Sequence, residues 1–288
     1  MRPKNLHSNI FLDSGDPAET KQIKKLLGFL DGQTTNPSLI SKNPTAQERL
    51  QSGQLFTANE ALGFYKQIIA EIADELSDKP ISIEVYADHT TTAQEMLTQA
   101  DEFCSWMDKP YIKLPITQSG LQAARQAVAD GIRVNMTLCF SQEQAAAVYA
   151  ATKGAKKDQV FISPFVGRLD DIGYDGVEVV ANILEMFADS DHHVRVLAAS
   201  IRSVEHLVRV IELEVDAVTV SAAVLHQWNA MQMPLVLQRQ VAKSSVLHPI
   251  EFSQIDLNRP WQEYAIEHQL TQAGLAKFVE DWNRLIGS

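Results

Sequence analysis

A lysine stands in the middle of a short apolar segment, Tyr-Ile-Lys-Leu-Pro-Ile, at residues 111–116. The segment has the length and composition of a buried strand that ends at Pro115. Burial penalises a charged ammonium group, so Lys113 must either have a carboxylate partner or become a neutral amine. A neutral amine is a nucleophile that forms Schiff bases with carbonyl substrates. This segment alone leaves two interpretations open: a Schiff-base lysine, or a structural lysine at a strand end or in a buried ion pair.

Short strand-like segments alternate with longer segments of helical period along the whole chain. We predict strands at residues 10–12, 29–34, 81–85, 111–114, 132–138, 160–163, 194–198 and 217–220, and helices that include 93–107, 120–129, 141–152 and 177–187. This alternation predicts the α/β class and a single parallel (β/α)₈ TIM barrel. An open doubly wound sheet is the alternative, and it is disfavoured because no Gly-x-Gly-x-x-Gly follows any strand.

Polar residues stand at or near the carboxyl end of every predicted strand. In chain order they are Asp13, Thr35 with Asn36, Glu84, Lys113, Asn135 with Thr137, Ser163 with Arg168, Ser200 with Arg202, and Ser221. Taken alone, Asp13, Asn36 and Ser163 would each be explained as cap or turn residues. Barrel enzymes build their active sites at this end of the strands. The recurrence at every strand therefore predicts an active site on this face.

Two arginines follow neighbouring predicted strands. Arg168 closes the block Ser-Pro-Phe-Val-Gly-Arg, and Arg202 closes Ala-Ser-Ile-Arg. The guanidinium group binds phosphate with two parallel hydrogen bonds, and barrels often bind phosphate after their later strands. A lone arginine is more often part of a surface salt bridge. Two arginines on adjacent strand ends predict a phosphate site.

Metal chemistry is not predicted, and no cofactor is expected. His192 and His193 precede the predicted strand at 194–198, which places them at the opposite end of the barrel. No histidine pair or carboxylate cluster has the spacing of metal ligands. We interpret the adjacent Asp170 and Asp171 as a solvated loop pair.

Composition limits the partners and the compartment. The 288 residues include 36 acidic and 25 basic ones, and the net charge of −11 disfavours nucleic acid, whose phosphates need a basic surface. The two cysteines, Cys104 and Cys139, form no disulfide or zinc pattern. No signal-like or transmembrane segment occurs. We expect a cytoplasmic protein that acts on small molecules and binds neither nucleic acid nor membrane.

Six blocks of the sequence resemble the transaldolase family. They are Phe-Leu-Asp (11–13), Asp-Gly-Gln-Thr-Thr-Asn-Pro-Ser-Leu-Ile (31–40), Ile-Lys-Leu-Pro (112–115), Val-Asn-Met-Thr-Leu-Cys-Phe-Ser (134–141), Ser-Pro-Phe-Val-Gly-Arg (163–168) and Ala-Ala-Ser-Ile-Arg (198–202). The resemblance implies a (β/α)₈ barrel with a Schiff-base lysine at Lys113. It implies transfer of a dihydroxyacetone unit from sedoheptulose 7-phosphate or fructose 6-phosphate to glyceraldehyde 3-phosphate or erythrose 4-phosphate, in the non-oxidative pentose phosphate pathway.

The resemblance also implies roles for the strand-end residues. Lys113 would attack the keto carbon, Glu84 and Thr137 would move protons through a shared water, and Asp13 would take the proton of the C4 hydroxyl. The residues implied to bind substrate are Thr35, Asn36, Asn135, Ser163 and Phe165 near the sugar carbons, and Arg168, Ser200 and Arg202 at the phosphate. Sugar phosphates are the expected partners, and we expect a homo-oligomer.

Two residues bear on the choice between transfer and simple aldol cleavage. Transaldolases carry Glu and Phe at the positions of Glu84 and Phe165, whereas the similar fructose 6-phosphate aldolases carry Gln and Tyr. The block at 167–176 instead resembles the shorter family members. We therefore expect a transferase, with an aldolase-like lyase as the alternative. A barrel that binds sugar phosphate without turnover is a second alternative, disfavoured because Lys113, Glu84 and Asp13 are all present.

The segment after the last predicted strand is longer than in the short family members. We divide the chain into a catalytic barrel at 1–235 and a C-terminal helical extension at 236–288 that packs on it. The last helix is predicted at 269–286, with its apolar residues roughly on one face. We expect this helix to lie on its own barrel, over the site, or against a neighbouring subunit. Residues 41–80 have room for one further helix.

Overall fold

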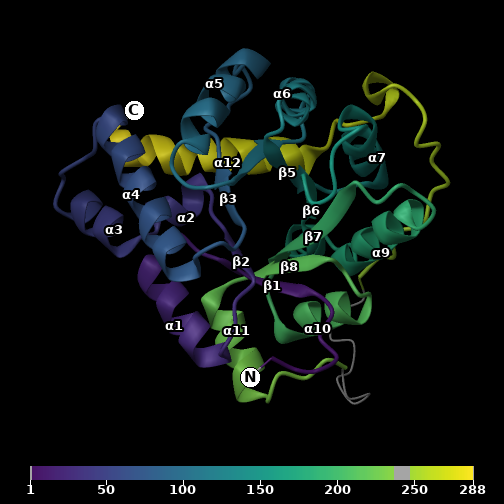
Figure 1. Ribbon diagram of the computed structural model, residues 1–288, viewed down its shortest axis with the longest axis horizontal. Coiled ribbons are helices and arrows are strands. Elements are labelled where there is room, and N and C mark those ends of the chain that lie inside the picture. Colours follow the sequence, from purple (N-terminus) through teal and green to yellow (C-terminus); the bar gives the residue numbers. More distant parts are fainter. Residues whose placement is uncertain (1, 237–246, 288) are drawn as a thin grey trace.

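The computed structural model describes residues 2–236 and 247–287, in which the strands form one closed parallel barrel (Figure 1). The strands are β1 (Asn9–Asp13), β2 (Gly32–Thr34), β3 (Ile81–Glu84), β4 (Tyr111–Pro115), β5 (Arg133–Cys139), β6 (Val160–Pro164), β7 (Val194–Ile201) and β8 (Ala217–Val220). β8 pairs with β1 and closes the barrel, with Ile10 opposite Val218. The predicted (β/α)₈ TIM barrel is confirmed. The prediction for 29–34 was wrong at its start, because Gly28 ends the preceding helix in a left-handed conformation and a loop follows it.

Helices surround the barrel (Figure 1). They are α1 (Pro17–Leu27), α2 (Pro37–Ser41), α3 (Pro44–Gln51), α4 (Ala58–Leu76), α5 (Ala93–Cys104), α6 (Gln118–Ala129), α7 (Gln142–Ala151), α8 (Val166–Asp170), α9 (Gly176–Phe187), α10 (Val204–Glu212), α11 (Ala222–Ala230), the short 3₁₀ helix η1 (Trp261–Glu263) and α12 (Gln269–Ile286). The room predicted at 41–80 holds both α3 and α4, and α12 has its predicted bounds.

The barrel interior is built in layers by the alternation of side chains along each strand. Phe11, Tyr111 and Phe161 form part of a separate buried cluster inside the barrel, with the rings of Phe11 and Phe161 in edge contact at 6.0 Å. Successive side chains of a strand point to opposite faces, so a residue two positions further on faces the same way. Asp13, Lys113 and Ser163 therefore lie one layer above the aromatic cluster, toward the carboxyl ends of the strands.

Two strands are irregular where they approach that end. The pairing register shifts between Met136 and Cys139 in β5 and between Ala198 and Ile201 in β7. Leu138 and Ser200 lie within these stretches with φ of 63° and 58°, a conformation that residues other than glycine rarely adopt. Such strain is concentrated at functional sites. The irregular stretch of β7 carries a residue of the predicted phosphate site.

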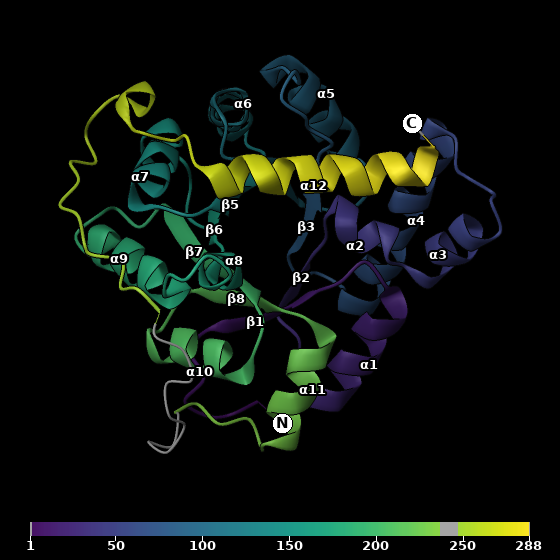
Figure 2. The ribbon, with the colours of Figure 1, turned by 180° about the vertical axis from the view of Figure 1, so that it is seen from behind.

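The last helix lies across the carboxyl end of the barrel (Figure 2). At its first turn the Thr271 hydroxyl donates to the Leu138 carbonyl at 2.9 Å. Near its end the buried Asp281 accepts a hydrogen bond from Ser38 in α2 and forms an ion pair with Arg284 at 2.6 Å. Helix α12 therefore packs on its own barrel and covers the carboxyl end of the strands, where the site is predicted.

Residues 247–268, which precede α12, pass along the outside of the barrel (Figure 1). His248 exchanges backbone hydrogen bonds with residues 173–175, and Ser253 accepts a hydrogen bond from Gln142 at 3.1 Å. The predicted domain boundary at 235/236 adjoins residues 237–246, which lie outside the described residues. The division into a barrel and an extension stays a prediction.

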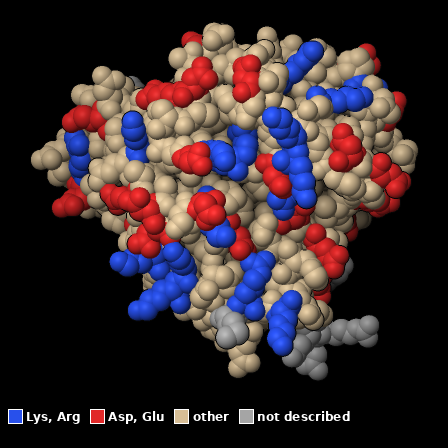
Figure 3. All heavy atoms as spheres, in the orientation of Figure 1, with Lys and Arg blue, Asp and Glu red and all other residues tan. Residues whose placement is uncertain are grey.

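Acidic and basic side chains lie interspersed on the face shown in Figure 3. Over the described ranges, no helix has the length and apolar character needed to cross a membrane.

Gly120 couples α6 to the strand that carries Lys113. A Cβ at this position would lie 1.9 Å from the Pro115 carbonyl oxygen, at the end of β4. We expect Gly120→Ala to lower the free energy of unfolding by about 1–3 kcal/mol, because backbone must shift to admit the methyl group. Gly63→Ala is the matched control, since nothing lies within 4 Å of its Cβ. It should instead stabilise α4 by about 0.5–1 kcal/mol. Denaturant unfolding of both variants measures the difference, and equal effects would contradict the assigned contact.

Candidate active site

A buried ion pair lies at the centre of the barrel. The parallel register places Lys113 of β4 opposite Glu84 of β3, and the lysine Nζ lies 2.9 Å from Glu84 Oε2. Both side chains are buried, with 4% and 3% of their surfaces exposed. Burial raises the pKa of the Glu84 carboxyl, and the charge of Lys113 opposes that rise. Of the two states expected for a buried lysine, a paired ammonium or a neutral amine, the structure has the pair, and Glu84 is the partner.

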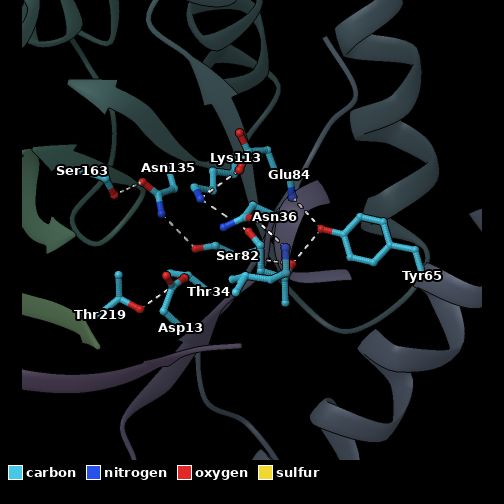
Figure 4. Close-up of polar contacts among 12 residues, drawn as sticks. Asp13, Thr34, Asn36, Tyr65, Ser82, Glu84, Lys113, Asn135, Ser163 and Thr219 are labelled. Atoms are coloured by element: carbon cyan, nitrogen blue, oxygen red, sulfur yellow. Dashed lines mark hydrogen bonds and ion pairs between the residues drawn. The ribbon is translucent and has the colours of Figure 1, made fainter. Parts of the chain in front are cut away.

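A second carboxylate, Asp13, lies on β1 near the same lysine. Burial raises the pKa of Asp13, while the Lys113 charge and a hydrogen bond from Thr34 act to lower it. The Thr34 hydroxyl donates to Asp13 Oδ1 at 2.6 Å and lies 2.6 Å from the Thr219 hydroxyl (Figure 4). Two carboxyl groups, each with a pKa that burial raises, therefore flank one amine. Such groups serve as proton donors and acceptors near neutral pH.

Polar side chains fix the floor around the ion pair (Figure 4). Asn135 accepts from the Ser163 hydroxyl at 2.7 Å and donates to Ser82 Oγ at 3.0 Å. On the other side, the Tyr65 hydroxyl accepts the backbone N–H of Glu84 at 3.0 Å and lies 2.7 Å from Thr35 Oγ1. Burial raises the pKa of Tyr65, so this hydroxyl stays neutral. These bonds link β3 to α4 on one side and, through Asn135, to β5 and β6 on the other.

A cavity of about 400 Å³ opens from this layer toward α12, and we refer to it as the mouth cavity. Eight of the residues predicted for the site line it: Asp13, Asn36, Lys113, Ser163, Phe165, Arg168, Ser200 and Arg202. They come from β1, β4, β6 and β7 and from the segments that follow β2, β6 and β7. The structure thus brings most of the predicted site together around one hollow.

The other four predicted residues lie beside the cavity without lining it. They are Thr35, Glu84, Asn135 and Thr137. Thr35 is fully buried, and its hydroxyl donates to the Ser82 carbonyl at 2.8 Å. Among the described residues, the buried Thr137 Oγ1 has no hydrogen-bond partner, whereas Glu84 Oε2 has only the ion pair with Lys113. An unpartnered buried hydroxyl in this layer suits the binding of a small polar molecule such as water.

The two predicted arginines lie at the mouth cavity in different surroundings. Arg168 lies beneath α12, 5.3 Å from the Phe165 ring and 5.5 Å from the Phe278 ring, and burial lowers its pKa. Arg202 is half-exposed and pairs with Asp171 at 2.5 Å. The salt-bridge interpretation thus holds for Arg202, which still lines the cavity. Within residues 2–236 and 247–287 Arg168 forms no ion pair with a carboxylate, and a partly buried guanidinium in that state favours an anionic ligand.

Glycines allow these cationic groups to pack closely. A Cβ on Gly167 would lie 2.6 Å from the Ser200 carbonyl and 2.7 Å from the Arg202 side chain. A Cβ on Gly274 of α12 would lie 2.4 Å from Arg168 Nη1. Both glycines therefore set where the arginines stand, one from α8 and one from the last helix.

The sequence of this chain is similar to known proteins over almost its whole length. The sequence model of the family described as "Transaldolase/Fructose-6-phosphate aldolase" matches residues 10–288. The chain belongs to this family. The predicted enzyme class, a transferase of the transaldolase type, is confirmed with it.

Relatives of similar length share about a third of their residues with the chain. A "Probable transaldolase" of Anaeromyxobacter sp. (strain Fw109-5) is 34% identical over 96% of this chain and 97% of its own length. Others from Chelativorans sp. (strain BNC1) and Leptospira biflexa are 35% and 34% identical, over 94% and 96% of this chain and 95% and 99% of their own lengths. The longer C-terminal region is therefore part of the similarity.

Several residues of this transaldolase-family site were missed by sequence reasoning. Lys42, which follows α2, and Lys277, Phe278, Asp281 and Arg284 of α12 line the mouth cavity. The resemblance blocks stop before α12, and Lys42 follows no predicted strand. Only the one-sided apolar pattern at 269–286 could have indicated that this helix covers something. No group of three or more potential metal ligands occurs in the described ranges 2–236 and 247–287.

Asp13→Asn tests the electrostatic cost of this site. The native state binds the Asp13 proton more tightly than the unfolded chain, because its pKa is raised. The ionised carboxylate therefore destabilises the fold above its native pKa and has no such effect below the unfolded pKa. We expect Asp13→Asn to raise Tm at pH 8, by about 2–4 °C for each kcal/mol recovered, and to change it much less at pH 3. A gain independent of pH would contradict the raised pKa.

Proposed function

We propose that the chain transfers a dihydroxyacetone unit between sugar phosphates through a Schiff base on Lys113. The buried Lys113–Glu84 pair on the wall of an arginine-lined cavity supports this proposal most strongly. A ketose phosphate fills the mouth cavity with its phosphate at Arg168 and Arg202. Binding energy at this remote group positions the reacting carbon.

Schiff-base formation begins with proton transfer inside the ion pair. A Glu84 whose pKa is raised by burial takes the lysine proton readily, and the pair becomes a neutral amine and a carboxylic acid. The amine of Lys113 attacks the keto carbon and forms a carbinolamine. Its hydroxyl leaves as water with the Glu84 proton, so amine, ketone and acid become iminium, water and carboxylate. The buried Thr137 hydroxyl is free to hold this water.

Carbon–carbon cleavage follows at the other carboxylate. Asp13 takes the proton of the C4 hydroxyl, the C3–C4 bond breaks, and its electrons move into the iminium. An aldose phosphate leaves, and a three-carbon enamine stays on Lys113. Ser163, Asn135 and Asn36 hold the sugar hydroxyls. A second aldose phosphate then takes up the three-carbon unit by the reverse steps.

The proposal includes the cell context and assembly expected from the sequence. Sugar phosphates are the proposed small-molecule partners, with the donors and acceptors named above and the pentose phosphate pathway as the setting. The two cysteines are free thiols, which is typical of proteins from a reducing cytoplasm. The homo-oligomer and the lack of a nucleic-acid partner stay predictions.

Borohydride trapping tests the Schiff base. Fructose 6-phosphate with borohydride should leave a three-carbon adduct on the peptide that contains Lys113, detected by mass spectrometry. Adding erythrose 4-phosphate should diminish the adduct, because the acceptor removes the bound unit. Lys113→Met should abolish trapping while the protein stays folded. An adduct that ignores the acceptor would favour aldol cleavage, and no adduct on a folded protein that binds the sugar would favour the non-catalytic alternative.

Glu84→Gln separates the chemistry of the acid from its structural role. We expect the fold to persist and the transfer rate to fall by about 10²–10⁴-fold, since a positioned proton donor is lost. The share of free dihydroxyacetone among the products should rise. In the parent enzyme, adduct formation should slow as the pH rises through the raised pKa of Glu84, because its acid form is lost. The Glu84→Gln variant should not show this decrease in the rate of adduct formation at high pH. An unfolded Glu84→Gln protein would mean that the role is structural.

A further inference from the structure

The two members of the ion pair face different hollows. Lys113 lines the mouth cavity, whereas Glu84 does not. Glu84 instead lines a second hollow of about 250 Å³, which we call the side cavity. The side cavity lies among α2, α4, α5 and α12, and its lining includes Leu62, Tyr65, Gln99 and Trp282. The lysine and its acid thus form part of the wall between the two cavities.

A third space lies beside Glu84, among the described residues. A small gap beneath α12, lined by Glu84, Pro115 and Phe278 among others, has no room for a water-sized sphere. Phe278 lines both this gap and the mouth cavity, so it separates the carboxyl group from the mouth. The roomy approach to Glu84 is the side cavity.

The outer rim of the side cavity is polar and open. Ala58, Asn59 and Glu102 are exposed at the surface. Deeper in, Tyr65 lies against the backbone of Glu84, on the side away from Ser163 in Figure 4. Gln99 is held in place because it both accepts from and donates to the Tyr86 backbone, each at 2.8 Å. The rest of the wall, which includes Leu62, Phe103 and Trp282, is mostly apolar. Such a wall offers too few hydrogen-bond partners for a sugar, whereas single water molecules can pass from the polar rim to Glu84.

The chemistry requires such a channel. Each Schiff base that forms releases one water, and each that is hydrolysed consumes one. Both events occur at Glu84 while a sugar phosphate fills the mouth cavity and excludes solvent from it. Water released there must leave by another way, or it will return to the carbon from which it came.

We propose that the side cavity is the path by which water exchanges between Glu84 and solvent during turnover. This inference rests on the proposed function, since it concerns the water of Schiff-base chemistry. Leu62, Gln99 and Trp282 then act as positioning residues, because they shape the path without contacting the sugar.

Exchange of the ketone oxygen measures this path directly. In water labelled with heavy oxygen, fructose 6-phosphate without acceptor gains label at C2 each time the released water escapes and another returns. Leu62→Trp fills the side cavity. We expect it to slow label exchange by about ten-fold or more, since water formed at Glu84 returns to the same carbon. The final yield of borohydride-trapped adduct and the KM should stay within about two-fold, since neither depends on where the water goes.

The controls isolate the cavity from general effects of the substitution. Leu257→Trp makes the same change in a separate hollow on the outside of the barrel and should leave exchange unaltered. Ala58→Phe narrows the exposed rim at the start of α4. If Leu62→Trp does not fold, the same slowing of label exchange is expected in Ala58→Phe. Exchange at the parent rate in a folded, trapping-competent side-cavity variant would overturn the inference. Loss of the adduct in the parent enzyme would instead overturn the proposed function.

Discussion

The ion pair between Lys113 and Glu84 is the interaction on which this site depends. Each charge is buried, and a buried charge without its partner would cost several kcal/mol. Adjacent positions on β3 and β4 bring the two together at 2.9 Å. The same burial that makes the pair costly raises the pKa of Glu84 and prepares a proton transfer that frees the amine. The barrel must therefore be rigid around this pair, and the hydrogen bonds of Tyr65 and Asn135 supply that rigidity.

The strand alternation explains why a buried polar layer is tolerated. Below it, Phe11, Tyr111 and Phe161 fill the barrel with apolar surface. Above it, polar groups from separate strands satisfy one another, as in the bonds from Ser163 to Asn135 and from Asn135 to Ser82. Hydrogen-bonded polar groups cost little when buried, whereas unpartnered ones cost much more. The Thr137 hydroxyl, which has no hydrogen-bond partner among the described residues, is therefore informative, because the proposed mechanism places a water at this layer.

The last helix completes the site from outside the barrel. Thr271 and Asp281 fasten it to β5 and α2, and Gly274 lets it lie directly on Arg168. Phe278 then separates the mouth cavity from the space around Glu84. A helix that contributes so much to the walls explains why the similarity to transaldolases extends beyond the eight strands to the end of the chain.

The sequence by itself determined the fold class, because the two periodicities of strand and helix are local properties of the chain. It also determined that a buried Lys113 needs either a carboxylate partner or the neutral form, and it placed the candidate site at the strand ends, since parallel strands bring their carboxyl ends together. Only the tertiary structure decided that Glu84 is the partner, that Thr35 is buried beneath the site, and that α12 supplies Lys277 and Arg284. Register across strands and the docking of a distant helix depend on contacts far apart in the sequence, and no local pattern encodes those contacts.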